Sequence, residues 1–146
     1  MGAHPWFYFV SYEEDVAKSL TALQQRELKA GRYNPVERFP HFPVDLQHEP
    51  GGNHASVEAA RAAASASGTR SILDMIRVSA APDFGAVAAL DETELMDLFG
   101  TAKPTAADLE ASDEMFDQME RGHGVYVIVY ADDEPSQIFF AGYSYD

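Results

Sequence analysis

The chain has 146 residues, 46% of them hydrophobic and 23% charged, which is typical of a single globular domain (residues 1–146) and excludes a wholly disordered chain. It contains no cysteine, which excludes disulfide bonds, thiolate metal sites and a cysteine nucleophile. The longest apolar runs, residues 6–10 and 125–131, are far shorter than the roughly 18 residues of a membrane span, and no secretory signal pattern opens the chain. We therefore expect a cytoplasmic protein that does not bind membranes.

The formal net charge of −14 is concentrated in the second half of the chain. Residues 1–82 hold nine acidic and eight basic side chains, residues 83–121 hold eleven acidic and two basic ones, and residues 122–146 add four acidic and no basic ones. Such a surface repels phosphate backbones, so we expect no binding to nucleic acid. It favours encounter with a basic protein partner, although a solvated surface that promotes solubility is the more ordinary interpretation.

The first half of the chain predicts one strand and two helices separated by a long loop. The strand "WFYFVSY" (residues 6–12) is apolar at both alternating sets of positions, so we expect it to be covered on both faces. Ser11 and Glu14 form a capping-box pattern that predicts a helix ended by Gly31. After the loop, an alanine-rich helix is predicted over residues 56–67.

The middle of the chain is ambiguous. Residues 71–79 ("SILDMIRVS") place charges at helical spacing but are rich in branched apolar side chains. We interpret this short segment, which Gly68 and Pro82 bound, as a strand, and residues 80–87 as a loop.

The remainder predicts two helices and two strands. Capping-box patterns open helices over residues 91–100 and 105–122. Strands follow over residues 125–131 and 137–145, and Pro135 between them predicts a hairpin loop longer than two residues.

Eleven of the seventeen aromatic residues lie in or next to the predicted strands. The sequence therefore predicts an α+β fold, in which a mainly antiparallel, aromatic-rich sheet of about four strands packs with about four helices. If the C-terminal strand is not central, its exposed edge could pair with a second copy, so a homodimer is possible.

The long loop, residues 32–56, is the first candidate site, because a structureless connection of this length in a small domain is usually functional or disordered. Arg32 can bind a carboxylate or phosphate, Tyr33 can orient a ligand, and His41 adds a third polar group over the sheet. The alternative for Arg32 is that it only caps the preceding helix.

The same loop raises the question of a metal site. His41, Asp45, His48 and His54 carry ligand atoms, but their spacing matches no compact metal motif. We favour ordinary surface histidines and predict neither a metal nor a cofactor.

Asp74 is the candidate catalytic residue. A carboxylate within an apolar strand is costly to bury without a partner, and a carboxyl with a shifted pKa can act as an acid or base. The alternative is a structural ion pair on a strand edge or helix surface. His123, between Gly122 and Gly124, follows a helix rather than preceding one, so we interpret it as part of a turn and not of a phosphate-binding loop.

Two functions from different classes remain open. We slightly favour a non-enzymatic binding module, similar in manner to an inhibitor or immunity protein, whose acidic second half faces a basic partner. The alternative is a small-molecule-binding domain or small enzyme with its site under residues 32–54. No nucleophile elbow, P-loop, dinucleotide fingerprint or kinase signature favours a particular enzyme class.

Overall fold

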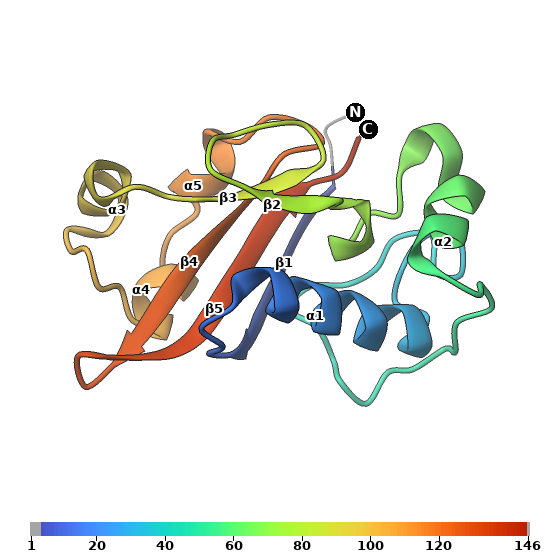
Figure 1. Ribbon diagram of the computed structural model, residues 1–146, viewed down its shortest axis with the longest axis horizontal. Helices are drawn as coiled ribbons and strands as arrows, with labels where there is room; N and C mark the ends of the chain where they lie inside the picture. The colour runs from blue at the N-terminus through green and yellow to red at the C-terminus, as the bar shows by residue number, and fades with distance from the viewer. Residues whose placement is uncertain (1–3, 146) are drawn as a thin grey trace.

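The computed structural model describes residues 4–145, apart from the side chain of Ala66, and its centre is one mixed sheet of five strands (Figure 1). The strands are β1 (Pro5–Ser11), β2 (Arg77–Ser79), β3 (Ala86–Ala89), β4 (Gly124–Ala131) and β5 (Glu134–Tyr143), in the order β1-β5-β4-β3-β2. Strands β1, β5 and β4 pair antiparallel, whereas β3 pairs parallel with both β4 and β2. The α+β class and the aromatic-rich sheet are confirmed. The expectation of four mainly antiparallel strands is corrected to five strands in a mixed sheet.

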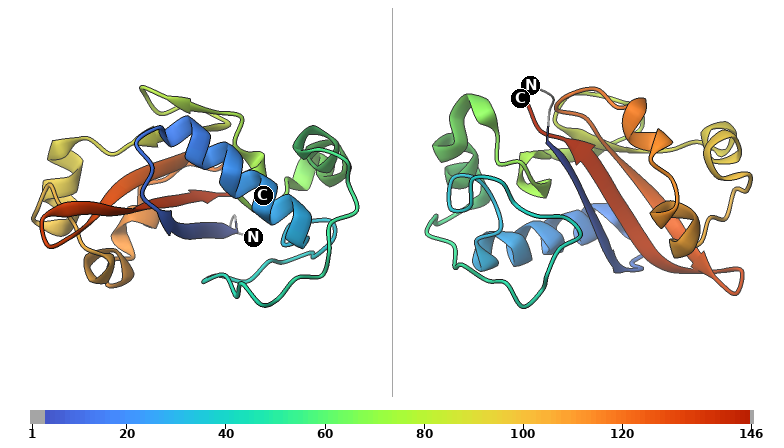
Figure 2. Two further views of the ribbon diagram at one scale, coloured as in Figure 1. Left: turned by 60° about the horizontal axis from the view of Figure 1, so that its bottom comes forward. Right: turned by 180° about the vertical axis from the view of Figure 1, so that it is seen from behind.

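Helices cover both faces of the sheet (Figure 2). One face packs against α1 (Val16–Ala30) and the short 3₁₀ turn η2 (Ile72–Asp74). Helix α2 (Val57–Ala64), which a second 3₁₀ turn, η1 (Ser65–Ser67), extends, packs against α1 and η2. The opposite side carries α3 (Glu92–Phe99), α4 (Ala106–Glu110) and α5 (Glu114–Asp117). Alternation along β1 supplies both cores, because Trp6 and Tyr8 point to the α1 side and Phe7 and Phe9 to the α4 side. No helix in residues 4–145 is long and apolar enough to cross a membrane.

Helix α1 begins later than the capping-box pattern predicts. Ser11 is still the last residue of β1, and Asp15 is the N-cap, where its carboxylate accepts from the Lys18 amide. The predicted end is confirmed, since Gly31 has φ +81° and its amide closes the helix on the Glu27 carbonyl.

Residues 71–79 do not form the predicted strand. They begin as the 3₁₀ turn η2, and only residues 77–79 pair as β2. The reason is the buried polar groups of the segment, because Ser71 caps the turn and Asp74 folds back onto Thr69. Strand β3 lies partly within the predicted loop of residues 80–87 and was missed.

The predicted helix over residues 105–122 is broken into α4 and α5. The predicted long hairpin loop is also wrong, since β4 and β5 are joined by a two-residue turn. Its residues Asp132 and Asp133 have φ +52° and +64°, as a type I′ turn requires. Pro135 is accommodated at a register shift in β5 beyond the end of β1.

The two described ends of the chain are neighbours at one end of the sheet (Figure 1). The His4 amide donates to Ser144 Oγ at 2.8 Å, and the Ser144 amide donates to the His4 carbonyl at 3.0 Å. Strand β5 lies between β1 and β4, so the suggested dimer edge along the C-terminal strand does not exist in residues 137–145; Asp146 lies outside the described residues.

Candidate functional site

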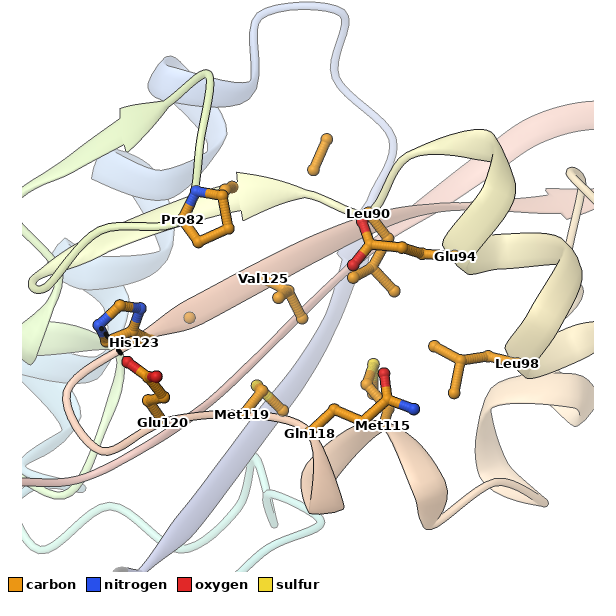
Figure 3. A pocket seen from close by; sticks show the side chains of 13 residues that line it. Pro82, Leu90, Glu94, Leu98, Met115, Gln118, Met119, Glu120, His123 and Val125 are labelled. Carbon is orange, nitrogen blue, oxygen red and sulfur yellow. Dashed lines mark ion pairs between the residues drawn. The ribbon is translucent and has the colours of Figure 1, made fainter.

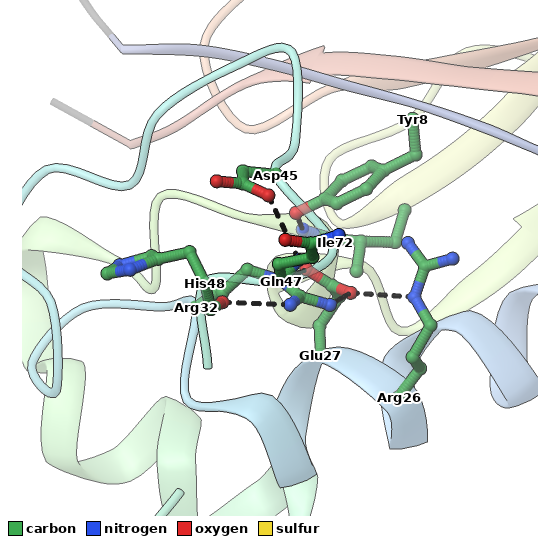
Figure 4. Close-up of polar contacts among 8 residues, drawn as sticks. All are labelled: Tyr8, Arg26, Glu27, Arg32, Asp45, Gln47, His48 and Ile72. Carbon is green, nitrogen blue, oxygen red and sulfur yellow. Dashed lines mark hydrogen bonds and ion pairs between the residues drawn. The ribbon is translucent and has the colours of Figure 1, made fainter. Parts of the chain in front are cut away.

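Arg32 is held by groups of its own chain (Figure 4). Its Nε and Nη2 atoms donate to the two carboxylate oxygens of Glu27 at 2.8 and 2.6 Å, and its Nη1 donates to the His48 carbonyl at 3.0 Å. Arg26 Nε adds a bond of 2.8 Å to Glu27. Glu27 is 0% exposed and Arg32 is 5% exposed. This two-pronged pair raises the pKa of Arg32 through its hydrogen bonds to Glu27, and the guanidinium stays charged.

The long loop is tied to the protein at several points rather than lying loosely over it. The Gly51 and Gly52 amides donate to the Ala30 and Lys29 carbonyls at 2.7 and 3.0 Å, so the loop satisfies carbonyls at the end of α1 that have no partner within the helix. A Cβ on Gly52 would lie 1.9 Å from the Leu28 carbonyl oxygen, which explains the glycine.

Tyr33 is fully buried, and its hydroxyl hydrogen-bonds with His54 Nδ1 at 2.7 Å. Burial raises the pKa of this phenol. His41, in contrast, is exposed, and His48 contacts the Glu37 carboxylate. Within residues 4–145 no group of three or more histidine or carboxylate side chains is placed to hold a metal ion.

Asp74 is buried in a polar cluster with an irregular backbone. Its Oδ1 accepts from the Thr69 amide at 2.6 Å and from Thr69 Oγ1 at 2.8 Å. Asn34 joins the same cluster, donating from Nδ2 to the Gly68 carbonyl and from its amide to the Thr69 carbonyl. The loop is therefore bonded to this segment by Asn34, and not by Arg32 or Tyr33, and also by the Arg38 carbonyl, which accepts from Arg70 Nη1 at 2.7 Å.

The second oxygen of Asp74, Oδ2, has no hydrogen-bond partner among the described residues. Burial raises the pKa of this carboxyl to about 6, against the opposing hydrogen bonds from Thr69. Tyr145 packs beside it, and its pKa is raised by burial and by the Asp74 charge. The carboxyl is only 1% exposed, so no ligand reaches it in this structure.

The four predicted site residues therefore do not meet in one place. Arg32, Tyr33 and Asp74 are occupied inside the protein, His41 faces solvent, and none of them lines a hollow that we describe in residues 4–145.

Hollows lie on both sides of the sheet, and the two that we describe in detail lie where α3 to α5 pack. The first, which we call the Met hollow, has a volume of about 330 Å³ between α3, the α5 region and strands β3 and β4 (Figure 3). Its apolar wall is formed by Leu90, Leu98, Met115, Met119 and Val125, beside the small residues Ala88 and Gly124. Because Ala88 carries only a methyl group at this part of the sheet, space remains between the helices.

Two carboxylates and an imidazole lie around the Met hollow. Glu94 comes from α3, and Glu120 follows α5, where its carboxylate lies 3.4 Å from His123 Nε2. The cavity thus combines an apolar floor with negative charge at its rim.

The second cavity, which we call the Phe hollow, lies across α5 from the first and has a volume of about 320 Å³. It is lined by Phe7, Phe9, Phe116 and Phe139, with Glu110 and Asp113 among its polar residues. Helix α5 separates the two cavities, because Met115 faces one of them and the next residue, Phe116, faces the other.

The acidic side chains of the second half gather on this side of the molecule, which we call the acidic face (α3 to α5 with their connections, residues 91–121). Most of its carboxylates are exposed: Asp91, Glu92, Glu94, Asp97, Glu110, Asp113, Glu114, Asp117 and Glu120. Its two basic residues are Lys103, which lies over the Tyr130 ring, and Arg121. The charge asymmetry of the sequence is therefore also an asymmetry in space.

Sequence reasoning did not find the residues of the two hollows. The sequence did not indicate that the predicted helix is interrupted after Ala111. Because of this break, α5 is a separate one-turn helix, with Met115 at one hollow and Phe116 at the other. His123 was interpreted as a turn residue, and the structure places it both after that turn and at the Met hollow.

Compared with protein-family models, curated proteins and solved structures, the chain matches none of them. Its function is therefore inferred from the chemistry of its own surfaces.

Proposed function

We propose that the protein is a non-enzymatic binding module whose acidic face docks a basic protein. The observation that carries this proposal is the pair of apolar hollows on either side of α5, within a surface rich in exposed carboxylates. Apolar cavities supply binding energy through burial, and the surrounding charge selects and steers the partner.

The charge distribution supports a basic partner in particular. Residues 83–121 hold eleven acidic and two basic side chains, whereas residues 1–82 are almost balanced. A cationic protein that approaches the molecule is attracted to the acidic face and not to the side of α1 and α2.

The alternative is a small-molecule-binding domain or small enzyme under residues 32–54, and one observation favours it. The unpartnered Oδ2 of Asp74 and the raised pKa of its carboxyl, about 6, are properties of an acid–base group. This alternative requires a movement that opens a path to Asp74, because the loop is bonded to α1 and to residues 68–70.

The proposal is tested with a synthetic amphipathic peptide of about 20 residues rich in lysine, arginine and leucine, long enough for five helical turns. The test variant Glu114→Gln/Asp117→Asn/Glu120→Gln removes three charges from the acidic face. We expect its association rate at low salt to be about three- to tenfold below that of the wild type, because electrostatic steering is weakened. Stopped-flow fluorescence over a range of salt concentrations measures this rate.

The matched control is Glu14→Gln/Glu49→Gln/Glu58→Gln, which makes the same change in net charge at exposed positions outside the acidic face. We expect it to retain a rate close to that of the wild type. Equal losses in both variants, or a wild-type rate that is indifferent to salt, would contradict docking on the acidic face.

A further inference from the structure

We propose that the Phe hollow is the receptor for one arginine side chain of the basic partner. This inference rests on the proposed function and names the group that the face recognises. It follows from three properties of the cavity: its aromatic walls, its carboxylates and its size.

The aromatic walls are held in place by one another. The Phe7 ring lies 6.0 Å from that of Phe139 and 6.3 Å from that of Phe116, and the Phe9 and Phe139 rings are 4.7 Å apart. Phe139 is buried and anchors this set to the core of β5, whereas Phe7, Phe9 and Phe116 are partly exposed. The cavity therefore offers ring surfaces that need little reorganisation on binding.

The charges around these rings are all negative among the described residues that line the cavity. Glu110 at the end of α4 and Asp113 just before α5 are both exposed, and no lining residue is basic. Rings attract a cation through their electron-rich faces, and carboxylates attract it by charge. A side chain with an apolar stem and a cationic end group can contact both the phenylalanine rings and the carboxylates.

The volume of about 320 Å³ is at the lower limit for small-molecule pockets, and it suits a single long side chain. Arginine fits better than lysine, because its planar guanidinium stacks on a ring, forms paired hydrogen bonds to a carboxylate and is more weakly hydrated. The Met hollow lacks phenylalanine and tyrosine, so it suits an apolar side chain from the same partner segment.

The test compares three small probes: the N-acetyl amides of arginine, lysine and citrulline, the last being a neutral analogue of arginine. Each is titrated into protein carrying ¹³C-labelled phenylalanine, and the ring signals are followed by NMR. We expect the arginine probe to shift the rings of Phe7, Phe9 and Phe116 most, with the lysine and citrulline probes about three- to tenfold weaker. Citrulline shifts equal to those of arginine would overturn the proposal.

The variant Glu110→Gln/Asp113→Asn is expected to remove most of the preference for arginine over citrulline. The control Glu92→Gln/Asp97→Asn makes the same charge change on α3, away from the Phe hollow, and is expected to keep the preference. If both variants lost the preference for arginine equally, the preference would arise from the overall negative charge of the protein, and the arginine site would be wrong. Unchanged amide spectra in both variants verify that each is folded.

Two longer probes separate this inference from the proposed function. If nona-arginine and nona-lysine bind equally and leave the ring signals of Phe7, Phe9 and Phe116 unshifted, the acidic face binds basic chains and the arginine receptor is wrong. If neither peptide binds at low salt, the proposed function fails together with the inference.

Discussion

At the scale of single residues, buried polar side chains in this protein mainly satisfy backbone or one another. Glu27 receives three N–H donors from Arg26 and Arg32, and this compensates the cost of taking its charge out of water. Gln24 and Arg61 both donate to the Met75 carbonyl, which fixes the irregular segment beside η2 in the interior. The residue types that resembled a ligand site in the sequence therefore also have an internal role.

Removing Arg32 tests that internal role. We expect Arg32→Ala to lower the free energy of unfolding by about 3–5 kcal/mol, because Glu27 remains buried with a single cationic partner. Arg32→Lys recovers only part of this loss, since an ammonium cannot form the two-pronged pair. Urea unfolding measures both values, and an unchanged stability of Arg32→Ala would show that the pair is not structural.

The buried Asp74 carboxyl makes the free energy of unfolding depend on pH, and the direction of this dependence can be predicted. Because its pKa is about 6 in the folded protein and near 4 in the unfolded chain, the folded state binds more protons between these values. This contribution to stability is present below pH 4 and is lost as the pH rises through 6, amounting to about 3 kcal/mol at most.

Unfolding of the wild type and of Asp74→Asn at pH 4 to 7 isolates this contribution, since the other carboxyl groups titrate in both proteins. We expect the wild type to lose stability relative to the variant as the pH rises. A difference that is constant, or that grows in favour of the wild type, would show that the Asp74 carboxyl is not buried as described.

At the scale of elements, segments with strong local signals were predictable and segments that depend on distant contacts were not. The end of α1 at Gly31 and the capping boxes of α3 and α4 follow from local backbone chemistry. Strand β3 has only Ala86, Val87, Ala88 and Ala89, and its pairing with β2 and β4, not its composition, makes it a strand.

The β4–β5 turn provides a test at this scale. Asp132 and Asp133 both have positive φ, for which Asn-Gly is the preferred pair in a type I′ turn. We expect Asp132→Asn/Asp133→Gly to raise the free energy of unfolding by about 0.5–1 kcal/mol, as measured by urea unfolding.

Two controls accompany this variant. Asp132→Asn/Asp133→Asn removes the same two charges but keeps both Cβ atoms, so it separates electrostatic relief from turn geometry. Asp132→Pro fixes φ near −65° where the turn needs +52°, and we expect it to be destabilising. A neutral or negative effect of the Asn-Gly pair would argue against this turn type.

At the scale of the whole molecule, the sheet separates two chemically different sides. The polar cluster and most of the long loop lie with α1 and α2, whereas the acidic face and the two hollows lie with α3 to α5, where Pro43 of the loop also lines the Phe hollow. The charge imbalance was evident in the sequence, but the hollows depend on how broken helices meet a flat part of the sheet, which no local pattern records. The basic partner was therefore a hypothesis from composition, and the place where it docks is a hypothesis from structure.

Crowding of like charges on the acidic face predicts that salt stabilises the protein. We expect the free energy of unfolding to rise by roughly 1 kcal/mol between about 20 and 300 mM sodium chloride, because screening reduces the repulsion. The rise should be smaller in Glu114→Gln/Asp117→Asn/Glu120→Gln than in the control variant outside the face. A stability that falls with salt would mean that attractive ion pairs dominate instead.

His4 and Ser144, which are hydrogen-bonded to each other, mark one end of β5, so a distance along this strand can be followed during unfolding. The Asp132–Asp133 turn is at the far end of β5, a strand of ten residues that spans roughly 33 Å. Since the chain has no cysteine, thiols introduced at these two ends of the strand would each take a dye, and energy transfer between the dyes would report unfolding while both hollows stay unlabelled.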